Sequence, residues 1–205
     1  MTHTLAEAGL RGHAEFMAIL KIARMGHPVL LRRADPVPDP TDPEIQHLIR
    51  DMIETMEDAR GAGLAAPQVH VPLRLFVFRV APHRTTGVPG DDVVGNTVLI
   101  NPEIEPLGDE QRLNWEGCLS IPSLQAAVPR WSRVRYRGLD AEGKPVEVEA
   151  AGFHAAVVQH EQDHLNGILY PRRRTDFTVF GFSDELARSG PRSITVRLRR
   201  APTRR

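Results

Sequence analysis

The chain has 205 residues, of which 41% are hydrophobic and 25% charged, and its formal net charge is zero. These values describe an ordinary globular chain with enough residues for one domain and its core, and they point to neither nucleic acid nor a membrane as a partner. The single cysteine, Cys118, excludes a disulfide framework within the chain and favours a reducing compartment.

The first residues, 1–18, form an N-terminal extension, and we expect a short amphipathic helix over residues 5–21. The stretch "MTHTLAEAGLRGHAEF" has no long apolar run and carries Glu7 and Glu15, so it is not typical of a secretory signal. No apolar run approaches the length of a membrane span, so we expect a cytoplasmic protein.

A proline-rich loop at residues 35–43 precedes the first strong helix signal. Asp42 is the expected N-cap and Pro43 the first helical residue. We predict that the helix runs to about Arg60 and ends at Gly61. Its apolar residues recur at helical spacing, namely Ile45, Leu48, Ile49, Met52, Ile53 and Met56.

The next stretch, "GAGLAAPQ" at residues 61–68, combines small residues with a terminal amide. Its glycines would let the backbone and a substrate approach closely, and Gln68 offers a neutral hydrogen-bond donor. The spacing is not that of a phosphate-binding loop. A helix cap followed by a packed turn would explain the glycines equally well.

Strands are predicted at residues 73–80 and 97–102, on either side of a polar loop at 81–95. The stretches "RVRYRGLD" and "PVEVEAAG" alternate in polarity around "AEGK" and indicate a hairpin. Near the end of the chain, Ile194, Val196 and Leu198 alternate with polar residues and indicate a late strand. The expected fold is a single α+β domain over residues 1–205, in which mixed or antiparallel β-sheets pack around a central helix.

The lone cysteine lies in "WEGCLSIP". Taken alone, Cys118 is better explained as a small buried hydrophobic residue than as a ligand. Its neighbours favour a site, because Gly117 allows close backbone approach and Glu116 could accept a hydrogen bond from a ligand histidine. The alternative for Glu116 is an exposed surface carboxylate.

The central helix is expected between Gly152 and Gly167 and carries "QHEQDH". His160 and His164 are four residues apart, so both rings project from one face, and Glu161 lies beside that face. This H-E-x-x-H pattern indicates two metal ligands and a general base. Two solvated histidines on a half-exposed helix are the alternative, but the surrounding apolar residues favour burial.

A catalytic metal needs a third protein ligand and an open position for water. No histidine follows His164, so the candidate for the third ligand is Cys118, upstream.

A basic tail covers residues 188–205. Seven arginines and no acidic residue follow Glu185, which leaves 19 basic and 26 acidic residues in the rest of the chain. The tail is either a solvated terminus or a contact for an anionic partner.

Three motifs, "GAGLAAPQ", "EGCLS" and "QHEQDH", occur in the order typical of peptide deformylases, and the chain resembles the bacterial members of that family over roughly residues 20–175. The resemblance implies a metal-dependent hydrolase that removes the formyl group from the N-terminal formyl-methionine of new polypeptides. It implies that Cys118, His160 and His164 hold one divalent metal ion. Ferrous iron is expected in the cell, with zinc, nickel or cobalt as possible replacements.

The resemblance also assigns roles in the reaction. A metal-bound water attacks the formyl carbon while Glu161 acts as general base. The Gln68 amide and the Leu119 backbone N–H stabilise the developing oxyanion. Gly63 lies along the bound peptide, and Gly117 is expected to contact it as well. Val157 and Ile121 are candidates for the wall of the methionine pocket.

Two departures stand out: Gln125 occupies a position where many relatives carry arginine, and the chain ends in loose basic residues where several relatives end in a helix. We expect nascent formyl-methionyl peptides as substrates and the ribosome as a partner through Arg197–Arg205, with no membrane or DNA partner. Two alternatives remain at this stage, a zincin-like endopeptidase and a metal- or peptide-binding module without catalysis.

Overall fold

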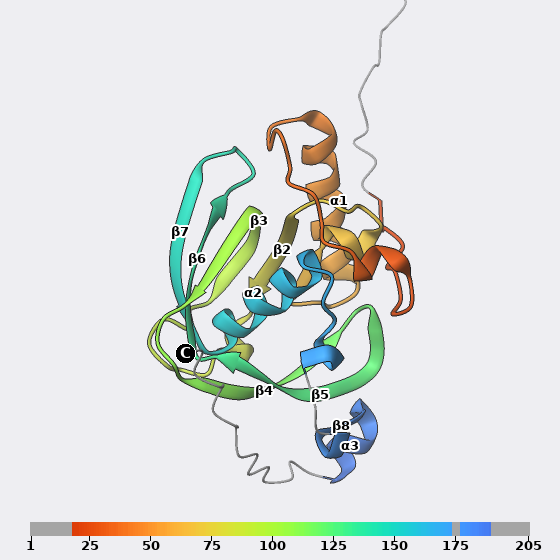
Figure 1. The fold of residues 1–205 in the computed structure, drawn as a ribbon, viewed down its shortest axis with the longest axis vertical. Helices are drawn as coiled ribbons and strands as arrows, with labels where there is room; N and C mark the ends of the chain where they lie inside the picture. Colours follow the sequence, from red (N-terminus) through yellow and green to blue (C-terminus); the bar gives the residue numbers. More distant parts are fainter. Residues whose placement is uncertain (1–17, 174–176, 190–205) are drawn as a thin grey trace, which may run out of the picture.

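The computed structural model describes residues 18–173 and 177–189 (Figure 1). They form an α+β fold in which two antiparallel sheets lie around one buried helix, as the sequence predicts. Within those ranges the helices of more than one turn are α1 (Pro43–Asp58), α2 (Gly152–Leu165) and α3 (Ser183–Ser189). Short 3-10 turns, which include η2 (Ala66–Val69), η3 (Pro82–Arg84) and η4 (Tyr170–Arg173), link several elements.

The predicted first helix is confirmed as α1. The Asp42 carboxylate accepts the Glu44 N–H at 2.8 Å, and four of the six stripe residues are buried while Leu48 and Ile53 are half-buried. The helix was predicted to run to about Arg60 and to stop at Gly61, but it ends two residues earlier, at Asp58, with Ala59 as its C-cap. Arg60 takes the left-handed conformation, with φ of 55°, and the Gly61 N–H closes the helix end on the Met56 carbonyl at 2.8 Å.

The larger sheet has five strands in the order β1-β2-β3-β6-β7. Its strands are β1 (Gly63–Ala65), β2 (Leu75–Val80), β3 (Val94–Pro106), β6 (Arg133–Leu139) and β7 (Pro145–Ala151). The predicted hairpin is confirmed, with Arg133 opposite Ala151 and Leu139 opposite Pro145. The predicted strand at 73–80 begins at Leu75, and the strand predicted at 97–102 is longer, because β3 spans 94–106.

The smaller sheet consists of β4 (Gln111–Cys118), β5 (Ile121–Trp131) and β8 (Phe180–Phe182), in the order β4-β5-β8. No strand was predicted in these three segments. Cys118 lies opposite Ile121, so β4 and β5 form a hairpin whose turn is residues 119–120. The last residue of β4 is therefore the cysteine, held at the end of a paired strand.

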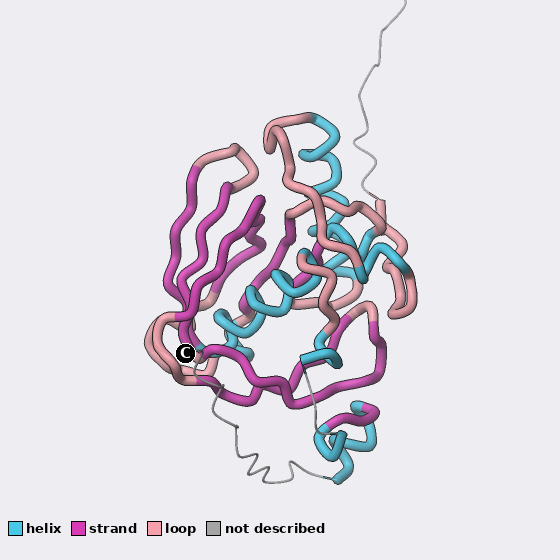
Figure 2. Tube along the Cα trace, viewed as in Figure 1, coloured by secondary structure: helices cyan, strands magenta, loops and turns pink. Residues whose placement is uncertain are grey.

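Helix α2 crosses the middle of the molecule, between the five-stranded sheet and the β4–β5 hairpin (Figures 1 and 2). Ala155, Val158 and Leu165 are completely buried and pack with Phe76 and Phe78 of β2. The half-exposed alternative for this helix is therefore wrong. Its polar residues lie inside the protein and need internal partners.

Two expected elements lie wholly or partly outside the described residues. The predicted helix at 5–21 is described only from residue 18, and residues 18–21 have no regular structure. The predicted strand at Ile194–Leu198 and the arginines that follow it lie outside the described ranges. Arg188, the first residue of the basic tail, is described and lies on α3, where it pairs with Asp184 at 2.7 Å.

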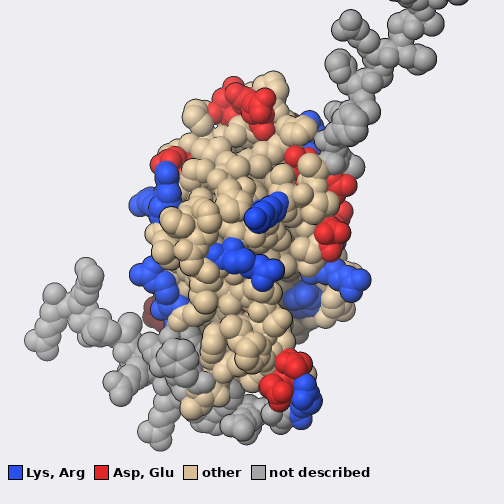
Figure 3. Space-filling view, turned by 90° about the vertical axis from the view of Figure 1, so that its right-hand side faces the viewer, with Lys and Arg blue, Asp and Glu red and all other residues tan. Residues whose placement is uncertain are grey.

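The described surface carries charge of both signs. On the face drawn in Figure 3, small groups of basic and of acidic side chains are interspersed and in places touch, so neither sign covers that face. Among the helices of the described part, none is long and apolar enough to cross a membrane.

Candidate metal centre and the cavity around it

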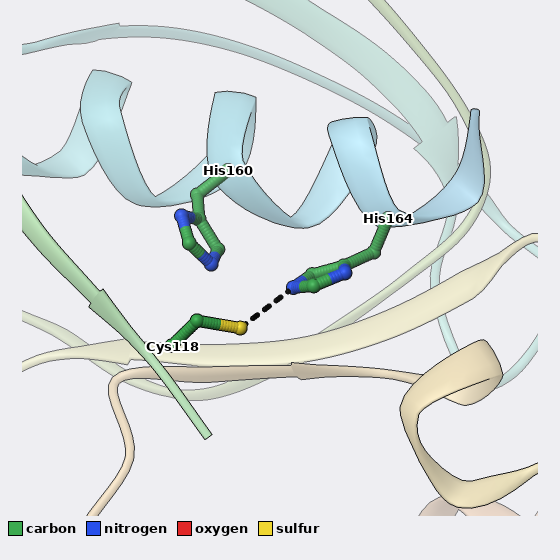
Figure 4. A group of neighbouring side chains, drawn as sticks. All are labelled: Cys118, His160 and His164. Atoms are coloured by element: carbon green, nitrogen blue, oxygen red, sulfur yellow. Dashed lines mark hydrogen bonds between the residues drawn. The ribbon is translucent and has the colours of Figure 1, made fainter. Parts of the chain in front are cut away.

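Cys118, His160 and His164 converge on one point (Figure 4). The two histidines project from the same face of α2, with ring centroids 5.0 Å apart. The Cys118 Sγ lies 3.2 Å from His164 Nε2, and the three possible ligand atoms lie within 4.8 Å of one another. A pair of helical residues one turn apart and a strand end thus supply three donors to one small volume.

This donor set fits a divalent metal. One sulfur and two imidazole nitrogens are ligands that iron, cobalt, nickel and zinc all accept. Three protein ligands leave one coordination position open, which is the pattern of a catalytic rather than a structural site. Cys118 and His160 also line a cavity of 620 Å³, so the open position faces space that a substrate can enter.

Glu116 holds His160 in place. The Glu116 Oε2 lies 2.8 Å from His160 Nδ1, which directs the opposite ring nitrogen toward the cysteine and the second histidine. The same carboxylate accepts Arg130 Nε at 2.6 Å and Arg130 Nη2 at 2.8 Å. Burial opposes its negative charge, but these hydrogen bonds from Arg130 and His160 lower the pKa of Glu116 to about 2.

Asp163 extends this buried network to the far side of the arginine. It accepts Arg130 Nη1 at 2.6 Å and Arg173 Nε at 2.7 Å. Arg130 is 2% exposed and Asp163 is 3% exposed, so neither charge has access to water. The two carboxylates are therefore balanced by Arg130 together with Arg173, and the contact of Arg130 with Asp163 fixes β5 against α2.

Glu161 has no such partner. Its side chain is 3% exposed, its Oε2 makes no hydrogen bond within the described structure, and burial raises its pKa to about 7. Gly63 leaves the space that this carboxylate occupies, because a Cβ at that position would lie 2.3 Å from Glu161 Oε1. A buried carboxyl with a pKa near neutrality can both accept and return a proton.

Gln68 lies in η2, on the other side of the metal centre. Its Oε1 accepts the Ala65 N–H at 2.8 Å, so the amide nitrogen must face the site. That nitrogen donates to Ser120 Oγ at 3.2 Å and to Cys118 Sγ at 3.6 Å. The fixed amide presents its N–H groups next to the sulfur, where charge on a reacting oxygen can be stabilised.

The other predicted site residues surround the same cavity. Leu119, Gly63 and Gly117 line it, as do Ile121 and Val157, the two candidates for the methionine pocket. A Cβ at Gly117 would lie 3.6 Å from Gln125 Cγ, an ordinary contact, so the protein itself does not require glycine there.

Four residues of the site were not predicted from the sequence, namely Arg130, Asp163, Ser120 and Arg173. Asp163 stands inside the "HEQDH" motif and two residues after Glu161, which was a usable signal. Arg130 gave no such signal in the sequence, because an arginine in a segment with no predicted strand is most simply interpreted as a surface residue. In the paired strands Arg130 lies opposite Arg112 and Glu116 lies opposite Ala126, and only the folded structure shows the Arg130 side chain reaching Glu116 at 2.6 Å.

Comparison with known proteins places this arrangement in context. The family model described as polypeptide deformylase matches residues 19–178. Peptide deformylase 2 of Ralstonia nicotianae is 52% identical over 168 residues, which cover 82% of this chain and 94% of that relative. Peptide deformylase 1 of Bordetella pertussis is 52% identical over 165 residues, with 80% of this chain and 93% of the relative covered.

Solved structures show the same fold. The peptide deformylase of Ehrlichia chaffeensis in complex with actinonin has a TM-score of 0.72 at 33% identity, covering 79% of this chain and 92% of its own. The class I type b peptide deformylase of Acinetobacter baumannii with bound Met-Ala-Ser has a TM-score of 0.71 at 35% identity, covering 78% of this chain and all of its own.

Proposed function

The chain belongs to the polypeptide deformylase family, the metal-dependent hydrolases that remove the formyl group from the N-terminus of new polypeptides, and on that premise we propose that Cys118, His160 and His164 hold its metal. The observation that carries the assignment is the convergence of the three donor atoms within 4.8 Å, beside an unpaired buried Glu161. The order of the motifs along the chain is consistent with it.

The metal, when bound, supplies Lewis-acid activation of a water molecule near neutral pH. Ferrous iron is the ion proposed in the cell, with zinc, nickel or cobalt as possible replacements, because a site of one thiolate and two imidazoles accepts all four. Metal analysis of protein purified without air tests this choice, and a preparation that holds mainly zinc under those conditions would contradict it.

Glu161 moves the proton. It takes one proton from the attacking water and returns it to the amine nitrogen as the bond between carbon and nitrogen breaks, so the products are formate and a free N-terminal amine. Its pKa of about 7 supports this role, because neither protonation state is then costly near neutral pH. Glu116, whose pKa is about 2, stays charged and holds His160.

The Gln68 amide and the Leu119 backbone N–H are proposed to stabilise the negative charge on the formyl oxygen. The hydrogen bond from the Ala65 N–H fixes the direction of the Gln68 amide, which means that little reorganisation is needed when the charge develops. Leu119 follows the metal ligand Cys118 directly, in the tight turn between β4 and β5.

The substrate is proposed to lie between Gly63 of β1 and Gly117 of β4, with its methionine side chain against Ile121 and Val157. Strand β1 is an edge strand, so its outer side is open to pairing with an extended peptide. The Met-Ala-Ser peptide in the Acinetobacter baumannii structure supports a peptide of this class.

Formate release from formyl-Met-Ala-Ser tests the function, with metal content measured on the same anaerobic sample. We expect turnover that rises with metal loading and no cleavage of internal peptide bonds. Internal cleavage would favour the endopeptidase alternative, and full metal loading without formate would favour the binding module. The family match supports neither the endopeptidase nor the binding module.

We further propose that the arginines at 197–205, outside the described residues, contact ribosomal phosphates in the cytoplasm, where nascent chains emerge. The dense positive charge in the sequence supports this. Co-sedimentation with ribosomes at two salt concentrations, with and without the tail, tests it. Equal binding after truncation would contradict the proposal.

A further inference from the structure

Two arginines stand at the mouth of the cavity and have no part in the chemistry described above. Arg60 and Arg84 both line the cavity, and both are exposed. Together they are called the arginine rim. Their position on the path of the substrate raises the question of whether they select among peptides.

Sheet topology brings the two residues to the same end of the site. Strands β1 and β2 are antiparallel, with Gly63 opposite Phe78, and the Arg79 N–H extends the pairing to the Ala62 carbonyl at 2.8 Å. Arg60 precedes β1 by three residues, and Arg84 follows β2 by four. The start of one antiparallel strand and the end of its neighbour lie together, so both arginines belong to one rim.

Each arginine is held by local structure. Arg60 occupies the left-handed position that ends α1. The Arg84 guanidinium lies 5.3 Å from the centre of the Phe153 ring, which also lines the cavity. The loop that carries Arg84 is fixed at Asp91, whose carboxylate accepts the Thr86 N–H at 2.6 Å and the His154 N–H at the start of α2 at 2.9 Å.

The rim carries positive charge without compensation. Within residues 18–173 and 177–189, neither Arg60 nor Arg84 makes an ion pair, whereas the neighbouring Arg79 pairs with Glu57 at 3.6 Å. The two carboxylates that line the cavity do not neutralise the rim, because Glu116 is bonded to the buried Arg130 and Glu161 lies at the reacting centre. Gln125 and Ser183, which also line the cavity, are neutral.

A peptide bound along β1 would reach this rim. Glu161 touches the position of Gly63, so the reacting end of the peptide lies there. An extended chain advances about 3.3 Å per residue, and Arg60 lies three residues before Gly63, ahead of the start of β1. The side chain of the second or third substrate residue would therefore face the arginine rim.

We propose that Arg60 and Arg84 make this enzyme prefer formyl-methionyl peptides with an acidic side chain at the second or third residue. The proposal rests on the proposed function and on the peptide path along β1. Gln125 is neutral, and no lysine or further arginine is among the described residues that line the cavity, so the arginine rim is its principal source of positive charge. Selection by charge should act mainly through KM, because the rim does not touch the reacting atoms.

The test compares kcat/KM for C-terminally amidated formyl-Met-Ala-Ser, formyl-Met-Glu-Ser, formyl-Met-Ala-Glu and formyl-Met-Ala-Lys. Amidation removes the terminal carboxylate, so the side chain supplies the only charge that varies. We expect the kcat/KM of at least one of the two glutamate peptides to exceed that of formyl-Met-Ala-Ser by roughly two- to fivefold, the range expected for an exposed ion pair. The kcat/KM of formyl-Met-Ala-Lys should fall below that of formyl-Met-Ala-Ser. Raising the salt concentration should reduce the differences.

The variants Arg60→Ala and Arg84→Ala should each reduce the preference for glutamate, and the double variant should abolish it. Lys144→Ala is the matched control, since Lys144 is exposed in the turn between β6 and β7 and lies outside the cavity lining. Equal kcat/KM for all four peptides, or a preference that survives in the double variant, would overturn the proposal and leave deformylation intact. No formate from any peptide would overturn the proposed function as well.

Discussion

Two buried carboxylates lie on different sides of α2, and their surroundings shift their pKa values in opposite directions. On the side that faces β5, Glu116 lies 8% exposed against Arg130 and His160, and its pKa falls to about 2. On the side that faces β1, Glu161 lies 3% exposed without a charged partner in hydrogen-bond contact, and its pKa rises to about 7. Burial is similar, so the partners account for the difference.

The two carboxylates are therefore suited to different functions in the site. The paired carboxylate is permanently charged and serves to orient a ligand histidine. The unpaired carboxylate can change its charge at little cost and is suited to proton transfer. Variants that exchange or remove these surroundings should therefore separate a loss of stability from a loss of catalysis.

The largest expected effect is that of Glu161→Gln. Formate release should fall by about 10²–10⁴, because the amide cannot accept the proton of the attacking water. The metal content should stay unchanged, since Glu161 is not among the three converging donors. Steady-state kinetics and metal analysis on one sample measure both, and near wild-type turnover would remove Glu161 as the base.

The next effect is on stability and concerns Arg130→Met. Removing the guanidinium leaves Glu116 and Asp163 buried without their shared partner, which should cost about 3–5 kcal/mol in the free energy of unfolding. Urea unfolding of the metal-free protein measures it. A loss below about 1 kcal/mol would mean that the network carries little of the stability.

The pH dependence of stability follows from the lowered pKa of Glu116. A carboxylate with a folded pKa of about 2 and an ordinary value of 4.5 stabilises the fold fully above pH 4.5, and this contribution is lost as the pH falls toward 2. The loss should approach about 3 kcal/mol. Metal-free Glu116→Gln should show a smaller decline between these pH values than the wild type, and identical slopes would contradict the pairing.

The smallest effect is expected for Arg173→Gln. Its side chain is 43% exposed, so its ion pair with Asp163 is partly screened by water. We expect a loss of at most about 1 kcal/mol in unfolding free energy. If the loss matched that of Arg130→Met, exposure would not be the factor that distinguishes the two arginines.

The sequence predicted the parts of the fold that have strong local signals. Helix α1 has a cap and a regular apolar stripe, and β6 and β7 alternate around a glycine turn. The hairpin of β4 and β5 lacks such signals, because prolines and small residues interrupt its alternation, and because it depends on strand pairing and on packing against distant residues such as Leu30 and Tyr170. The ordered motifs indicated the three donors and Glu161, but the buried Arg130 depends on a strand pairing that no local pattern encodes.

The most direct test of the account is a cobalt(II) titration of the metal-free protein without air. The chain has one cysteine, so an absorption band from thiolate-to-cobalt charge transfer can arise only from Cys118. We predict that the band saturates at one equivalent of cobalt and disappears in Cys118→Ser. Tight cobalt binding should require both His160 and His164. One equivalent of cobalt bound to the wild type without that band would contradict the three-ligand site.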